Sequence, residues 1–138
     1  MRKKSTCTPS DMSTIPSDAS TIAQYVVNRC IEIGKPVTNL QLQKILYYIQ
    51  KELQFRKEIA FYNDFEDIGF GPAILSVYDR FCGYGVQPIT VSGDNVTFGE
   101  YDQIFDKIIA EKIDLYPWEF PEYLQAAREN KMRRMRRE

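Results

Sequence analysis

Apolar residues recur along the chain at the spacing of amphipathic α-helices. The clearest case is residues 38–55, where apolar residues from Leu42 to Leu53 fall at i, i+3, i+4, i+7 and i+11. Weaker stripes of the same period predict four further helices, over residues 21–34, 72–82, 100–114 and 121–138. The pattern therefore predicts a mainly helical protein.

The ends of two of these helices have recognisable signals. Thr21 with Gln24 and Thr38 with Gln41 have the spacing of a capping box, in which each side chain bonds the other residue's backbone N–H. Gly34 is typical of the residue after a helix C-terminus. We therefore expect one helix to begin near Thr21 and stop at Gly34, and the next to begin after Thr38 and end near Arg56.

The segments between the helices predict little β-structure. Residues 59–70 mix aromatic and β-branched residues irregularly with acids, which predicts a loop with one short strand. Pro72 suits the first position of the following helix, because its missing N–H would have no partner there. Residues 88–98 contain two β-prone runs around a Ser-Gly-Asp-Asn turn, the signature of a hairpin.

Together these patterns predict one compact α+β domain: a bundle of about five helices around a central second helix, with one small β-hairpin. A chain of 138 residues fits a single domain and buries about 70% of its unfolded surface. Residues 1–17 are rich in Ser, Thr and Pro and predict a flexible leader, followed by the helical domain over 18–128 and a basic tail over 129–138.

Composition changes this picture only slightly. The net charge of -1 hides a basic end, since the last eight residues hold five of the 18 cations. The three cysteines, Cys7, Cys30 and Cys82, form no CxxC pair, which is typical of a reduced protein. No window has the roughly 18 apolar residues of a membrane helix, and no apolar run follows the basic start. We therefore expect a cytoplasmic protein that does not enter a membrane.

The candidate chemistry argues against an enzyme. The chain has no histidine, so intact Ser-His-Asp and Cys-His constellations are excluded. Asp64, Glu66 and Asp67 could hold Mg²⁺ in a metal-dependent enzyme, although a solvated loop beside a helix N-terminus explains the same acids. The "GFGP" of residues 69–72 fits no phosphate-loop pattern. We expect no catalytic residue, metal or cofactor.

The far side of the helix over 38–55 is unusual because it is not polar. It carries four apolar or aromatic residues with two lysines between them: Leu40, Tyr47, Tyr48 and Phe55, with Lys44 and Lys51. Either other parts of the domain cover this side, or it is a partner surface, since tyrosines beside lysines offer stiff amphipathic contact area.

Three motifs carry a resemblance to a known family. They are "TNLQLQKILYY" at 38–48, "FGP" at 70–72 and "VYDRFCGYG" at 77–85, in this order and within residues 22–89. In this arrangement the chain resembles the Panacea antitoxin domain, which includes SocA-like and phage-associated proteins. The resemblance covers about half of the chain.

The resemblance implies a small cytoplasmic protein that neutralises a cognate toxin protein by binding it, and that in some members delivers the toxin to a AAA+ protease. Its motif positions are the candidate partner-binding residues, and Lys51 joins them from the far side of the helix. They are Leu40, Lys44, Tyr47, Tyr48, Lys51, Phe70, Gly71, Pro72 and Tyr78. Among these, we expect Lys44, Tyr47 and Lys51 to contribute to the contact.

Two other readings stay open. Leu40 and Tyr47 could lie at a homodimer seam instead. The same fold could also serve as a phage-encoded inhibitor of a host defence or regulatory protein, acting by protein binding or nucleic-acid mimicry. In that case the basic residues 131–138 would be the part that engages or mimics nucleic acid, which is otherwise an unlikely partner.

Overall fold

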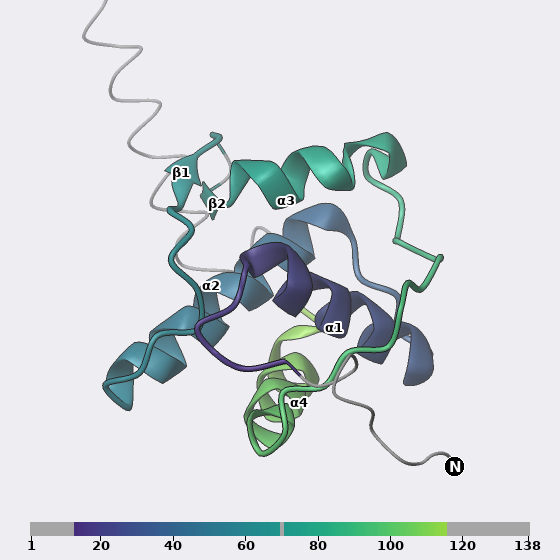
Figure 1. Cartoon of the computed structure of the whole chain (residues 1–138). Helices are drawn as coiled ribbons and strands as arrows, with labels where there is room; N and C mark the ends of the chain where they lie inside the picture. Colours follow the sequence, from purple (N-terminus) through teal and green to yellow (C-terminus); the bar gives the residue numbers. More distant parts are fainter. Residues whose placement is uncertain (1–12, 70, 116–138) are drawn as a thin grey trace, which may run out of the picture.

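The structure is a computed structural model and describes residues 13–69 and 71–115 (Figure 1). These residues form four α-helices and a two-stranded antiparallel sheet. The elements are α1 (Ala19–Glu32), α2 (Asn39–Phe55), β1 (Glu66–Asp67), β2 (Pro72–Ala73), α3 (Leu75–Arg80), a 3-10 turn (Cys82–Tyr84) and α4 (Tyr101–Lys112). The predicted α+β class is confirmed. The predicted fifth helix, the tail and residues 1–12 of the leader lie outside the described residues.

Helix α2 is the centre of the fold, as its apolar pattern predicts. It packs against α1, α3, α4 and β2, so every other helix of the described part touches it. In Figure 1 it runs behind α1, with α3 above and α4 below. Because α2 is surrounded by other elements on several sides, side chains on more than one of its faces are buried.

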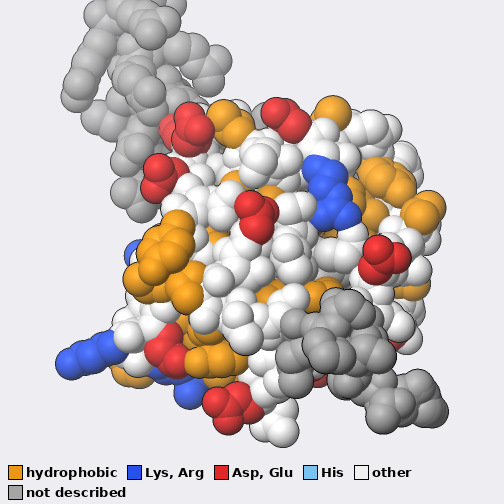
Figure 2. Space-filling view, viewed as in Figure 1, with side chains coloured by type: hydrophobic (Ala, Val, Ile, Leu, Met, Phe, Trp, Pro, Cys, Tyr) orange, Lys and Arg blue, Asp and Glu red, His pale blue; other side chains and the backbone are white. Residues whose placement is uncertain are grey.

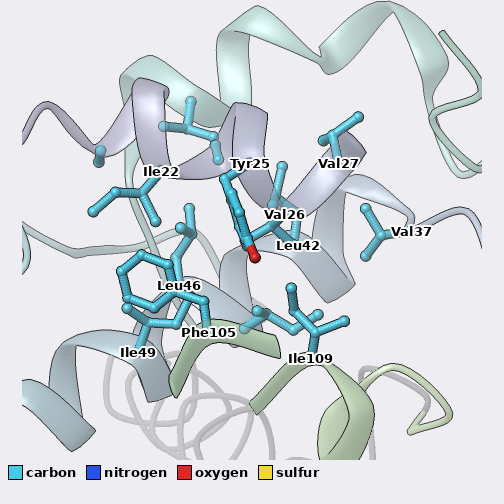
Figure 3. Close-up of a cluster of buried hydrophobic side chains, with 14 of the residues drawn as sticks. Ile22, Tyr25, Val26, Val27, Val37, Leu42, Leu46, Ile49, Phe105 and Ile109 are labelled. Carbon is cyan, nitrogen blue, oxygen red and sulfur yellow. The ribbon is translucent and has the colours of Figure 1, made fainter. Parts of the chain in front are cut away.

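The hydrophobic core forms where three helices meet (Figure 3). Ile22 and Val26 from α1 face Leu46 and Ile49 from α2, and Phe105 from α4 closes the group. All five side chains are fully buried. Burying one such side chain contributes about 1.5–3 kcal/mol, so this junction holds the helices together.

The two predicted capping boxes have different outcomes. At α2 the box forms, because Gln41 N donates to Thr38 Oγ1 at 3.2 Å and Thr38 N donates to Gln41 Oε1 at 3.0 Å. At α1 the prediction is wrong: the helix begins at Ala19, and the Asp18 carboxylate accepts from Ser20 N at 2.8 Å. Asp is at least as good an N-cap as Thr, so the helix starts three residues earlier.

Pro72 is not the first residue of a helix, which corrects a second prediction. It lies in β2 opposite Asp67, and α3 begins only at Leu75. The backbone here is bonded to α2 side chains: Lys44 Nζ donates to Pro72 O at 3.2 Å, and Ile74 N donates to Gln43 Oε1 at 2.9 Å. These bonds hold the segment extended, and a proline without an N–H is tolerated at such an edge.

The small sheet is present but not where the turn signal predicts it. It pairs residues 66–67 with 72–73, whereas residues 88–98 form no hairpin. In that segment Ile89 N donates to Val37 O at 2.8 Å and Gly93 N donates to Asn28 Oδ1 at 2.9 Å. At these two points its backbone is bonded to neighbouring segments rather than to a partner strand.

Residues 13–17, which we expected to belong to the leader, lie against the body. Ser13 N donates to Thr97 O and Ser17 N donates to Ala60 O, both at 2.8 Å. The half-buried Ile15 packs on the core. This short stretch therefore closes the domain beside α1.

Candidate partner-binding site

The polar side chains of α2 hold irregular backbone in place. Asn39 Nδ2 donates to Tyr78 O at 3.0 Å, and Gln43 Nε2 donates to Asn39 Oδ1 at 3.1 Å. Gln43 Oε1 in turn accepts from Ile74 N. These two amides lie one turn apart, so they form a chain of hydrogen bonds from α2 to both ends of α3.

Further along α2, the Gln50 side chain bonds backbone groups of two successive residues, Ala60 and Phe61. Its Nε2 donates to Phe61 O at 2.7 Å, and its Oε1 accepts from Ala60 N at 3.0 Å. Gln41 Nε2 likewise donates to the carbonyls of Ile113 and Leu115. The glutamines of the "TNLQLQK" motif and Gln50 therefore bond backbone groups of other segments and help to hold those segments in place.

Lys44 belongs to the interior as well. Its relative exposure is 0%, and its ammonium group donates to Pro72 O. The expectation that Lys44 lies on an exposed contact surface is wrong, because its stem packs inside and its head group reaches the carbonyl of β2. The Lys44 side chain therefore connects α2 to β2.

Two tyrosines and two lysines meet on the outer side of α2. The Tyr47 ring lies edge-on to Tyr48, with 5.7 Å between centroids, and to Phe65, with 5.4 Å. Lys51 Nζ lies 5.3 Å from the Tyr47 ring centre, and Lys112 Nζ from α4 lies 4.2 Å from that of Tyr48. We call these five residues the tyrosine face.

The described structure covers the tyrosine face only in part. Tyr47, Tyr48 and Phe65 are half-buried, and Lys51 is exposed. The tyrosine rings are held by edge contacts and cations, which limits their rotamer freedom. A partner would thus meet a stiff aromatic surface with fixed positive charges.

Four other candidate residues are not part of this face. Leu40 and Tyr78 are half-buried, Gly71 is buried, and Pro72 is half-buried in β2. Pro72 and Tyr78 lie beside the N-terminal half of α2, next to Lys44 and Asn39 respectively. Phe70 lies outside the described residues. Some of the candidate partner-binding residues thus take part in contacts within the fold, and others form the tyrosine face.

Sequence reasoning missed two members of the tyrosine face. Phe65 lies in a loop whose aromatic pattern is irregular, but it is four residues from Phe61, which it contacts at 5.7 Å between ring centroids. That spacing is a weak local signal. Lys112 carries no signal at all, because only the packing of α4 against α2 brings it over Tyr48.

Other chemistry in the described part is limited. No group of three or more Asp, Glu or Cys side chains there is placed to hold a metal ion, so the structure does not gather Asp64, Glu66 and Asp67 into such a site. None of the described helices is both long and apolar enough to cross a bilayer.

A polar cleft of about 300 Å³ lies between α1, α4 and residues 95–96. Its groups are bonded to one another: Tyr25 Oη donates to Asp106 Oδ1 at 2.6 Å, and Arg29 Nε lies 3.3 Å from the same oxygen. Burial and the Asp106 carboxylate raise the pKa of Tyr25 above its usual value. The neutral Tyr25 side chain and the Asp106 carboxylate thus connect α1 to α4. We therefore interpret the cleft as part of the packing between these helices and not as a binding site.

We compared the chain with protein-family models, with curated proteins and with solved structures, and none of the three gave a match. The family resemblance therefore rests on the sequence motifs themselves.

Proposed function

We propose that this protein is a non-enzymatic antitoxin that neutralises a cognate protein toxin by direct binding. The observation that carries the proposal is the set of three motifs at 38–48, 70–72 and 77–85, in the order typical of the Panacea antitoxin domain. In a related mode, the bound toxin would be passed to a AAA+ protease. Both modes take place in the cytoplasm, and neither needs a catalytic group.

The bonds between these motifs support the proposal, because several motif residues hold other motifs in place. Lys44 donates to a carbonyl of the "FGP" motif, Asn39 donates to a carbonyl of the "VYDRFCGYG" motif, and Gln43 accepts from Ile74 N between the two. Motifs far apart in the chain therefore form one physical unit, which accounts for their occurring together.

The tyrosine face is the surface we assign to the toxin. Tyrosines supply large contact area at low entropic cost, and Lys51 and Lys112 add charge selectivity. A standard interface covers about 800 Å² of each partner, so the contact would extend beyond these five residues. The partner is expected to offer an apolar patch edged by carboxylates.

The test is rescue from a toxin encoded beside this gene, with both proteins co-expressed. Lys51→Glu should abolish rescue while the melting temperature stays nearly unchanged, because exposed substitutions usually alter stability by less than about 0.5 kcal/mol. Lys107→Glu makes the same charge change at another exposed site and should leave rescue intact. Lys44→Glu is unsuitable, since reversing a buried charge should unfold the domain.

Rescue by Lys51→Glu at the wild-type level would refute the tyrosine face as the contact. The absence of an adjacent toxin gene, together with capture of a host defence protein from a lysate, would refute the antitoxin function and favour an inhibitor of that protein.

A further inference from the structure

Three large hydrophobic side chains are exposed at the end of α2 and in the loop that follows it. Phe55 is 86% exposed, Ile59 43% and Tyr62 74%. They fall within eight residues of the chain, the largest such group among the exposed large hydrophobics of the described part. Single exposed apolar residues are ordinary, but a group of them marks an interaction site.

Charges of opposite sign lie at the two ends of this group. Lys57 follows Phe55 at the end of α2, and Asp64 and Glu66 follow Tyr62 on the way into β1. Along the left edge of Figure 2, hydrophobic side chains lie in the middle and acidic ones at the upper end, whereas basic and acidic side chains adjoin one another at the lower end. Near Lys57 the other charges are already bonded, because Arg56 donates to Glu52 and Tyr101 donates to Glu58. In Figure 1 the chain runs along the same edge, from the end of α2 through the loop to β1.

These charges are not used inside the domain. Among the salt bridges of the described residues, none involves Lys57, Asp64 or Glu66. All three side chains are exposed. They are therefore available to a charged partner.

The backbone at Lys57 adds a separate observation. Both α1 and α2 end in the same motif: Lys35 N donates to Cys30 O after α1, and Glu58 N donates to Leu53 O after α2. The left-handed residue is Gly34 in the first case, with φ 77°, and Lys57 in the second, with φ 63°. Glycine suits this conformation best, and a strained residue at such a place indicates a use for its side chain.

We propose that this surface, formed by Phe55, Lys57, Ile59, Tyr62, Asp64 and Glu66, binds the same surface of a second copy of the chain in a two-fold symmetric dimer. We call it the α2-end surface. A two-fold axis through its apolar centre places Lys57 of each copy opposite Glu66 of the other.

Self-complementarity selects a second copy as the occupant. In a two-fold interface, residue i of one copy meets residue j of the other, and j meets i. A patch with cations at one end and anions at the other satisfies this rule, because reversal brings unlike charges together at both ends. A patch of one sign would repel its own copy.

The inference does not depend on the proposed toxin contact. The tyrosine face and the α2-end surface share no residue, so failure of one leaves the other intact. The homodimer considered from the sequence would be formed through Leu40 and Tyr47, and neither residue belongs to the α2-end surface.

The test is sedimentation equilibrium of the full chain over a concentration series, with melting curves to check folding. The wild type should dimerise. Lys57→Glu and Glu66→Lys should each weaken the dimer by tenfold or more, since each change places like charges together twice in the symmetric interface. Lys107→Glu should dimerise like the wild type.

Mixing the two variants provides the decisive measurement. In a pair made of one copy of each variant, positions 57 and 66 of the two copies face each other with unlike charges at both ends. An equimolar mixture should therefore form a heterodimer of near wild-type affinity. Loss of folding cannot produce such a recovery.

A wild type that stays monomeric at every concentration would overturn the proposal. So would single variants that dimerise normally, or variants that fail to associate when mixed. Loss of toxin rescue by Lys57→Glu with an unchanged oligomeric state would assign this surface to the toxin instead.

Discussion

At the scale of residues, the polar side chains of α2 are the main determinants of the structure. Asn39, Gln43, Lys44 and Gln50 are all buried, although their residue types are usually found at surfaces. The side-chain amide of Asn or Gln carries both hydrogen-bond donors and an acceptor. It can therefore bond the N–H and C=O groups of an irregular backbone segment that has no partner strand. Polarity at these positions was therefore a poor guide to exposure.

Gln50 provides a test at this scale. Gln50→Met keeps the shape of the side chain but leaves Ala60 N and Phe61 O without their partner. We expect the free energy of unfolding to fall by about 2–4 kcal/mol, since two buried backbone groups lose their hydrogen bonds. Urea unfolding measures the change.

Gln54→Met is the matched control, because Gln54 is exposed on the same helix. It should alter the unfolding free energy by less than about 0.5 kcal/mol. Equal urea midpoints for the two variants would show that the Gln50 bonds contribute nothing net.

Among the site residues, sequence reasoning was right about exposure where helix geometry alone decided it. Lys51 is exposed and Tyr47 is only half-buried on the outer side of α2. It was wrong for Lys44, whose ammonium group is drawn inward by a carbonyl 28 residues away. No local pattern reports the position of that carbonyl.

At the scale of elements, local signals located α2 and α4 well. The capping box at Thr38 forms because its atoms belong to residues three positions apart. Asp18 and Pro72 show the limit of such signals: a second capping residue lay just upstream of one predicted start, and side chains from α2 held the other segment extended. Local sequence signals thus predict where a helix can begin, but contacts with other segments decide whether it begins there.

The two helix C-termini provide a test at this scale. Lys57→Gly should raise the free energy of unfolding by about 0.5–1 kcal/mol, because it relieves a side chain in the left-handed region. Gly34→Lys should lower it by about 1 kcal/mol. A Cβ at Gly34 would meet no atom within 4 Å, so this cost is one of backbone conformation alone.

Both values can be read from chemical denaturation of the chain at one low concentration, where dimer formation does not contribute. A destabilised Lys57→Gly variant would mean that the Lys57 side chain makes a stabilising contact within the monomer, contrary to this account.

At the scale of the whole molecule, the core makes stability depend on alkaline pH. Burial raises the pKa of Cys30 from 9.0 to about 12, and burial with Asp106 raises that of Tyr25. Both groups hold their protons more tightly in the folded than in the unfolded state. Their contribution is therefore complete below about pH 9 and is lost as the pH rises.

We expect the free energy of unfolding, measured by urea denaturation, to fall progressively between pH 9 and 11, by up to about 1.4 kcal/mol per pH unit for each group. Cys30→Ala should remove the part of the fall that begins near pH 9 and leave the part due to Tyr25. A flat profile to pH 11 in the wild type would contradict the burial of these groups.

The sequence by itself determined the helical class, the central place of α2 and the ends of that helix, because apolar period and capping act between residues a few positions apart. Only the tertiary structure decided which polar side chains are buried and that residues 88–98 form no hairpin. It also decided that the Lys112 ammonium group lies over the ring of Tyr48, 64 positions away. These outcomes depend on which backbone groups and rings other segments bring within reach. That proximity exists only once the helices have packed.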